Sequence, residues 1–181
     1  MTELSLHILD IVQNSLTAGA DRICVRIAEN PLADRYEIRI GDNGRGMDEA
    51  TAKKATDPFF TSRTTRRVGL GISLLKQNAE LTGGRLSLYS KPGKGTIINA
   101  RFSHSHIDRQ PLGDIAGTIC LILEANPGIE LSYEHRTEIE TYIFDSAETK
   151  TVLEVSDFTH EILGMVKVLI HTNLEDIRVA F

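Results

Sequence analysis

The 181-residue sequence has no tryptophan, two cysteines and five prolines, and it lacks a long hydrophobic run. Cys24 and Cys120 lie far apart and form no CxxC pair, which argues against a disulfide framework or a zinc site. No apolar run approaches the ~20 residues needed to span a bilayer. The acidic start, residues 1–4, lacks the basic region of a signal peptide. We therefore expect a cytoplasmic protein with reduced thiols and no membrane partner.

Basic residues are scarce in the last part of the chain. Residues 1–107 hold 15 Lys and Arg against 11 Asp and Glu, whereas residues 108–181 hold 5 against 14, which accounts for the net charge of −5. This break in sign indicates two regions with different roles. Because an acidic region repels phosphates, we expect no nucleic-acid partner.

Hydrophobic spacing predicts a mixture of helices and strands in two parts. The first part, residues 1–103, should hold helices at 4–18, 48–55 and 70–82 and strands at 22–28, 36–40, 86–88 and 97–102. The polar segment 104–110 is the expected linker. Residues 111–181 form an acidic region with the pattern α-β-β-α and no assigned role.

One face of the first predicted helix carries a polar stripe. His7, Asp10, Asn14 and Thr17 recur at i, i+3, i+7 and i+10 on an otherwise apolar helix. Unpaired polar groups cost about 1–3 kcal/mol each when buried, so such a stripe needs partners or a ligand. The oxygens of Asp10 and Asn14, one turn apart, suit Mg²⁺. A solvated helix face is the alternative interpretation.

Two glycine-containing segments suit a nucleotide. Asp42-Asn43-Gly44-Arg45-Gly46 follows a predicted strand, where a carboxylate can accept a hydrogen bond from an exocyclic amine and glycine admits a flat ring. Gly69-Leu70-Gly71 precedes a helix, whose free N–H groups can hold phosphate. Each segment alone is also typical of an ordinary turn or helix start. The sequence holds no GxxxxGK[ST] phosphate-binding loop.

The order of these segments resembles the GHKL ATPase superfamily of gyrase B, heat-shock chaperones, histidine kinases and mismatch-repair ATPases. Residues 10–14 look like its N box, 42–46 and 69–71 like its two glycine boxes, and 57–60 like its F box, with Gly95-Thr96 as a further nucleotide contact. The stretch 14–20 is most similar to mismatch-repair ATPases, and 58–75 to histidine kinases. The resemblance covers residues 4–102.

This resemblance implies an α+β fold, a two-layer α/β sandwich of the GHKL (Bergerat) type, with the C-terminal region as an appendage. It implies ATP and Mg²⁺ as cofactors, Asn14 as the Mg²⁺ ligand, Asp10 as the catalytic residue and residues 47–68 as an ATP lid. The implied nucleotide-binding residues are Asn14, Asp42, Gly44, Gly46, Met47, Phe59, Arg63, Gly69, Leu70, Gly71 and Thr96.

Two departures from the family pattern keep two functions open. Asp10 stands where the family usually has glutamate, so the acid is one methylene shorter, and no helical hairpin with a phosphoacceptor histidine precedes residue 4. The first expectation is a signalling kinase that phosphorylates a histidine or serine of a partner protein in trans. The alternative is an ATP-gated regulatory binding module, or a slow ATPase, without phosphotransfer. A homodimer is left open.

Overall fold

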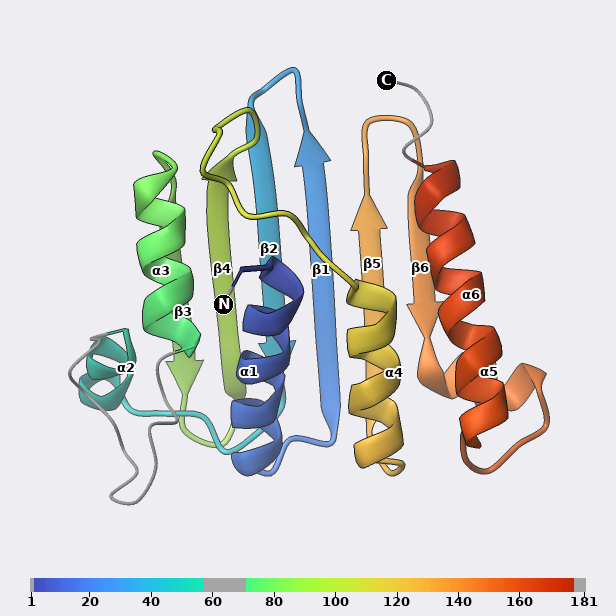
Figure 1. Cartoon of the computed structure of the whole chain (residues 1–181). Helices are drawn as coiled ribbons and strands as arrows, with labels where there is room; N and C mark the ends of the chain where they lie inside the picture. The colour runs from blue at the N-terminus through green and yellow to red at the C-terminus, as the bar shows by residue number, and fades with distance from the viewer. Residues whose placement is uncertain (1, 57–70, 178–181) are drawn as a thin grey trace.

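The computed structural model describes residues 2–56 and 71–177, and within them the chain forms one mixed sheet with helices on one side (Figure 1). The strand order is β3-β4-β2-β1-β5-β6. The strands are β1 (Arg22–Asn30), β2 (Arg35–Asp42), β3 (Arg85–Lys91), β4 (Gly95–Ser103), β5 (Glu130–Arg136) and β6 (Thr141–Asp145). The helices are α1 (Leu4–Thr17), α2 (Glu49–Ala55), α3 (Gly71–Leu81), α4 (Ile115–Ala125), α5 (Ser146–Val152) and α6 (His160–Asp176).

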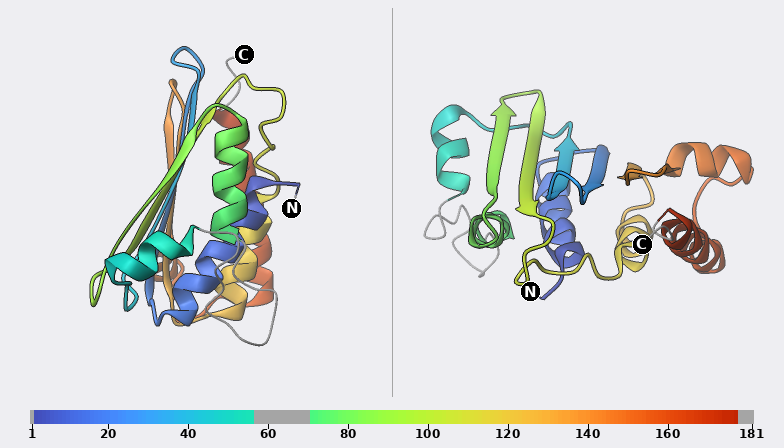
Figure 2. Two further views of the ribbon diagram at one scale, coloured as in Figure 1. Left: turned by 90° about the vertical axis from the view of Figure 1, so that its left-hand side faces the viewer. Right: turned by 90° about the horizontal axis from the view of Figure 1, so that it is seen from above.

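Alternation along the strands decides which face is buried. In β1 the side chains of Ile23, Val25 and Ile27 are buried, and those between them are not. The buried face packs against α1, α3, α4 and α6, which lie side by side over it. Helices α2 and α5 lie near the two edges of the sheet, beside β3 and β6 (Figure 2). The other face carries no helix in the described ranges. The expected two-layer α+β arrangement is therefore confirmed, with helices on one face of a mixed sheet.

The C-terminal region continues the same sheet. Strand β5 pairs in parallel with β1, from Arg22 opposite Glu130 to Ala28 opposite Arg136, and β6 pairs antiparallel with β5. This region contains one helix more than the spacing predicted: α5 begins after Asp145, whose carboxylate caps it by accepting from the N–H groups of Ala147 and Glu148. The division at residues 104–110 stays a prediction.

The segment before α4 closes the N-terminus of α1. No side chain caps α1, because Glu3 at the cap position makes no such hydrogen bond. Instead the N–H groups of Leu4 and Ser5 donate to the carbonyls of Pro111 and Leu112 at 2.9 and 2.8 Å. These bonds satisfy two of the donors that a helix start leaves free, so the position of α1 depends on the C-terminal region.

Candidate functional site

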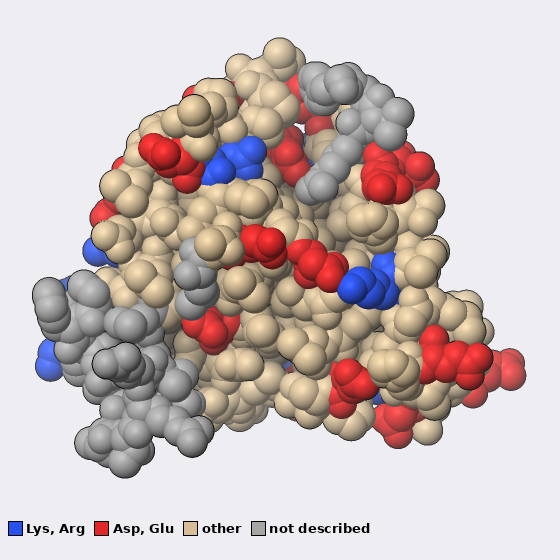
Figure 3. Space-filling model, in the orientation of Figure 1, with Lys and Arg blue, Asp and Glu red and all other residues tan. Residues whose placement is uncertain are grey.

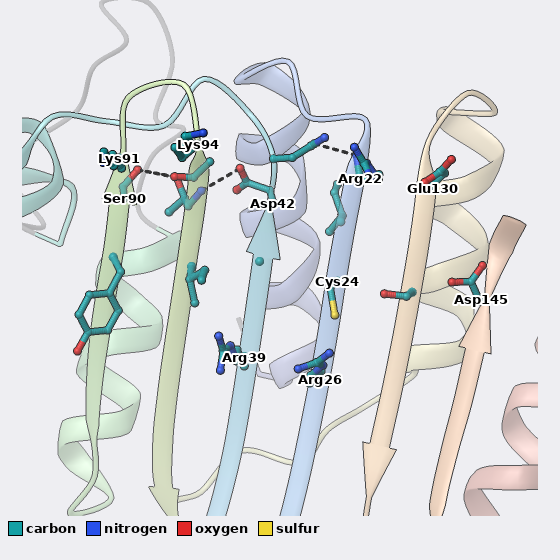
Figure 4. A pocket seen from close by; sticks show the side chains of 18 residues that line it. Arg22, Cys24, Arg26, Arg39, Asp42, Ser90, Lys91, Lys94, Glu130 and Asp145 are labelled. Atoms are coloured by element: carbon teal, nitrogen blue, oxygen red, sulfur yellow. Dashed lines mark hydrogen bonds between the residues drawn. The ribbon is translucent and has the colours of Figure 1, made fainter.

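The carboxylate of Asp42, at the end of β2, is held from three separate segments. Its Oδ2 accepts from Ser15 Oγ of α1 at 2.7 Å, and its Oδ1 accepts from the N–H groups of Gly44 at 2.9 Å and Thr96 at 3.2 Å. Figure 4 shows Asp42 at the end of its strand beside β4. Because helix, turn and neighbouring strand all donate to it, the carboxylate has a fixed direction.

A cavity of about 320 Å³ opens beside this carboxylate on the helix-covered side of the sheet. Apolar side chains of α1, α3 and β4 form part of its wall, and Asp42, Asn14 and Thr96 are among its polar groups. Apolar walls with a few fixed polar groups are typical of small-molecule sites. The lining residues are Ile11, Asn14, Ser15, Thr17, Ala18, Asp42, Arg45, Gly46, Met47, Thr51, Ala55, Ile72, Thr96 and Ile98.

Glycine is required where two chain segments meet beside the cavity. Gly46 has φ +65°, and a Cβ there would overlap the backbone carbonyl of Lys91; Gly95 has φ +95°, and a Cβ there would overlap the carbonyl of Asp42. Any side chain at either position would push the turn after β2 away from the β3–β4 hairpin. The glycines thereby keep the segment of Met47 beside Asp42.

A hydroxyl pair ties the same hairpin to that segment. Ser90 Oγ accepts from the N–H of Met47 at 2.8 Å and lies 2.9 Å from Thr96 Oγ1. The Asp42 contact to the Thr96 N–H then joins this pair to the carboxylate. Four residues of three segments are therefore linked at one end of the sheet.

Asp10 and Asn14 occupy one face of α1, as the polar stripe predicted, but their side chains have different surroundings. Asn14 lines the cavity, and its side-chain amide makes no hydrogen bond with a residue of the described ranges. Asp10 does not line it; instead a Cβ at position 71 would lie 2.8 Å from the Cβ of Asp10, so Gly71 admits this carboxylate beside the start of α3. The carboxylate therefore lies beside the first residue of α3, at the end of a helix where backbone N–H groups have no partner within the helix.

The residues around the cavity could share the implied magnesium ion with a nucleotide. No group of three or more His, Cys, Asp or Glu that could hold a metal occurs among residues 2–56 and 71–177. Mg²⁺ bound with a nucleotide commonly takes only one or two protein oxygens and completes its shell with phosphates and water. Asn14, an amide oxygen facing the cavity, fits that requirement.

His7, one turn before Asp10, is buried between α1, α3 and the segment before α4. Its Nε2 lies 3.1 Å from Gln110 Oε1 and 3.1 Å from Asn78 Nδ2, while its Nδ1 is buried with no hydrogen-bond partner in the described ranges. Burial is the main reason that the pKa of His7 is lowered, partly opposed by the hydrogen bond to Gln110. A neutral imidazole therefore bridges Gln110, in the segment before α4, to the last turn of α3 at Asn78.

The structure brings most of the described predicted residues together. Asn14, Asp42, Gly46, Met47 and Thr96 line the cavity, Gly44 bonds to Asp42, and Asp10 and Gly71 touch each other. Predictions for Phe59, Arg63, Gly69 and Leu70, and for lid residues 57–68, lie outside the described residues. Sequence reasoning missed two side chains, Ser15 and Ser90. Ser15 follows Asn14 directly, so a signal existed, but Ser90 sits in a strand without any motif.

The family profile of "Histidine kinase-, DNA gyrase B-, and HSP90-like ATPase" matches residues 2–106, more than half of the chain. The chain therefore belongs to this ATPase family, and the resemblance read from its motifs is confirmed.

Curated relatives include sensor proteins. A putative sensor protein of Shewanella frigidimarina is 33% identical over 108 residues, which cover 59% of this chain and 16% of the relative. Sensor protein kinase FleS of Pseudomonas aeruginosa is 37% identical over 89 residues, which cover 49% of this chain and 22% of the relative. The chain thus spans less than a quarter of the length of these relatives.

A solved structure, the N-terminal domain of a DNA repair protein, shares the fold. It superposes with a TM-score of 0.56 and 17% sequence identity over 81% of this chain and 53% of that one. The similarity reaches beyond residues 2–106, because that span alone is less than 81% of the chain. Separately, no helix among the described residues is long and apolar enough to cross a membrane.

Proposed function

We propose that the chain binds Mg-ATP in the cavity beside Asp42 and transfers its γ-phosphoryl group to a partner protein in signalling. The observation that carries the proposal is the carboxylate of Asp42, fixed by Ser15, Gly44 and Thr96 at the wall of a cavity that is apolar in part. A fixed acceptor there selects a ring with an exocyclic amine, as adenine has. The family membership and the sensor-kinase relatives support the same nucleotide and chemistry.

Asn14 and the start of α3 would hold the other end of the nucleotide. Asn14 lies one helical turn beyond Asp10 and faces the cavity, so its oxygen would bind Mg²⁺. Free N–H groups at the start of α3 would receive phosphate oxygens, because the positive end of the helix dipole lies there. Bound Mg²⁺ supplies charge neutralisation for the phosphates.

Asp10 would accept the proton in this reaction. Its carboxylate lies against Gly71, at the helix end that would hold the phosphates, so it can accept a proton from an acceptor group or from water. A general base must reach within ~2.6–3.2 Å of that proton, or act through one water. We place this activity in the cytoplasm, with the acceptor on a partner protein.

An ATP-gated binding module, or a slow ATPase, is the second candidate function. The observation that favours it is that Asp10 packs against Gly71 and is not among the residues that line the cavity. An acid held there by a short side chain can bind the base of α3 without reaching a substrate. ATP would then act by setting the affinity for a partner.

The Asp10→Asn variant separates the two candidates. Asparagine keeps the shape but cannot accept the proton, so a kinase should retain ATP affinity and lose about 10²–10⁴-fold in turnover. Calorimetry would measure binding, and transfer of labelled γ-phosphate in native lysate would measure turnover. Asn14→Ala is the control, because it should weaken Mg²⁺-dependent binding in either case. Slow turnover that Asp10→Asn leaves unchanged would overturn the kinase and leave the gated module.

A further inference from the structure

The helix-free face of the sheet contains a second, larger hollow, which we call the sheet-face trough. It measures about 820 Å³, spans all six strands and lies on the opposite side of the sheet from the helices (Figure 4). Its lining includes the charged side chains of Arg22, Arg26, Arg39, Lys94, Glu130 and Asp145 and the ring of Tyr89. Only the end of the sheet, at Asp42 and Thr96, is shared with the cavity of the proposed nucleotide site.

Strand register explains why this face is hollow. Ile97, Gly41, Cys24 and Ser132 lie opposite one another on β4, β2, β1 and β5, and this row provides only short side chains at its centre. Two residues further along, Arg39 and Arg26 rise from the same face because side chains alternate with a period of two. Long side chains therefore stand beside a floor of small ones, and the floor runs across the strands.

One end of the trough is positive, and only part of its charge is neutralised within the described ranges. Arg26 and Arg39 are direct cross-strand partners on β1 and β2, an arrangement that destabilises a sheet because like charges oppose each other. Arg26 has a partner in Glu134 at 3.1 Å. Arg39 and Lys94 form no salt bridge with a residue of the described ranges. The positive potential between β1 and β4 is therefore available to a ligand.

The other end of the trough is negative. Glu130 of β5 and Asp145 of β6 line it, and Figure 4 shows both on the far side of β1 from Arg39, with Arg22 of β1 opposite Glu130. The charge thus changes sign along a floor of five strand spacings, about 24 Å at ~4.8 Å per spacing. A nucleic-acid strand carries one sign throughout and would meet repulsion at β5 and β6. A polypeptide can change sign within that length, which is about seven extended residues.

We propose that the sheet-face trough binds an extended segment of a partner polypeptide, with acidic side chains over β2 and β4 and basic side chains over β5 and β6. Arg39 and Lys94 would pair with the acidic block, and Glu130 and Asp145 with the basic block. Tyr89 at the β3 edge is 68% exposed. Its ring offers an aromatic surface for an apolar residue of the partner next to the partner's acidic block. This inference goes beyond the proposed function and does not depend on it, because the two sites lie on opposite faces.

The helix-covered side offers no comparable positive surface in its described part. Figure 3 shows that acidic side chains outnumber basic ones there. On the strands, by contrast, the register places Arg26, Arg39, Arg85 and Arg101 on the helix-free face. An acidic segment of a partner is therefore drawn to the sheet rather than to the helices.

The test uses two labelled peptides of about eight residues with identical composition and zero net charge. One has an aspartate block followed by a lysine block, and the other alternates the same residues. Fluorescence anisotropy with the full chain should show that the block peptide binds at least about fivefold more tightly, because only it matches the two ends of the trough. Equal affinity for both peptides would overturn the proposal.

Two charge reversals locate the binding. Arg39→Glu should weaken the block peptide about tenfold, since it replaces an attraction with a repulsion. Arg85→Glu is the matched control, because Arg85 lies on the same face but does not line the trough, and it should change affinity less than about twofold. Circular dichroism confirms that both variants fold, and equal losses in both would contradict the assignment.

Other occupants are tested in the same experiment. A thymidine oligonucleotide of similar length that binds more tightly than the block peptide, and loses affinity in Arg39→Glu, would replace the peptide with nucleic acid. Sedimentation of the chain alone tests a second copy: a dimer that Arg39→Glu dissociates would show that the trough is an interface between copies. Either result overturns the proposal, whereas block-selective peptide binding to a monomer supports it. ATP binding is measured separately, so failure here leaves the proposed function untouched.

Discussion

In the proposed site, nucleotide choice would depend on one side chain, Asp42. Both carboxylate oxygens already accept hydrogen bonds, from Ser15 on one side and from the Gly44 and Thr96 N–H groups on the other. These donors keep the group aimed at the cavity, and a carboxylate oxygen has lone pairs left for one further donor. An adenine amine would supply that donor.

The Asp42→Asn variant tests this reading. Ser15 Oγ also lies 3.2 Å from the Ile11 carbonyl, so it can donate there while the new amide donates to it, and the fold should persist. An amide N–H facing the adenine amine leaves two donors opposed, which should weaken ATP about tenfold or more. Inosine triphosphate, with an acceptor at that ring position, should lose less.

Calorimetry with both nucleotides measures the change. The ratio of ATP to inosine triphosphate affinity is the informative quantity, because it is insensitive to general loosening of the site. A ratio unchanged between wild type and Asp42→Asn would remove Asp42 as the adenine contact.

At the scale of elements, the spacing of apolar residues predicted those helices and strands that bury one face in the core. Apolar spacing on α1 and alternation on β1 and β2 were enough to find those elements, because one face of each packs into the core. The short helix α5 was missed, since in its seven residues only Ser146 is buried and the helix rests on the Asp145 cap instead. A short helix with few buried residues lacks the apolar spacing from which a helix can be predicted.

Contacts between distant segments could not be read in this way. Parallel pairing of β5 with β1 joins residues more than a hundred positions apart, and no motif marks it. Ser90 reaches the site only because the hairpin places it beside Met47. By contrast Asp42 and Asn14 were found because a recognised family pattern supplied the long-range information that spacing lacks.

The β3–β4 hairpin provides a test at this scale through two of its glycines. Gly95→Ala should destabilise the chain by about 3 kcal/mol or more, because φ is +95° and the new Cβ would overlap the Asp42 carbonyl. Gly93→Ala is the control: its φ is also positive, at +70°, but nothing lies within 4 Å of a Cβ there, so only about 1 kcal/mol is expected. Urea unfolding measures both, and equal losses would mean that close approach to Asp42 is unimportant.

At the scale of the molecule, the sheet and core do not stop at the predicted linker. One buried cluster includes Leu4 and Ile8 of α1 together with Ile115 and Ile119 of α4, and β5 completes the hydrogen bonding of β1. The segment before α4 also closes the start of α1 and reaches His7 through Gln110. Removing residues 111–181 would therefore expose the apolar side of α1 and one edge of β1.

We expect the chain to unfold as one cooperative unit, which hydrogen exchange across a denaturant series can measure. Amides of β1, β4 and β5 should converge on the same opening free energy, because no strand of this sheet can leave without exposing the shared core. Saturating Mg-ATP, at about a hundred times its dissociation constant, should raise that energy by about 2.7 kcal/mol. The increase should appear in β5 as fully as in β4, although β4 lines the nucleotide cavity through Thr96 and Ile98 and β5 does not line it. The amides of β5 and α4 could instead exchange at a lower opening free energy than those of β1 and show no response to ATP. That result would show that residues 111–181 fold separately and that their contacts to α1 do not couple the two regions.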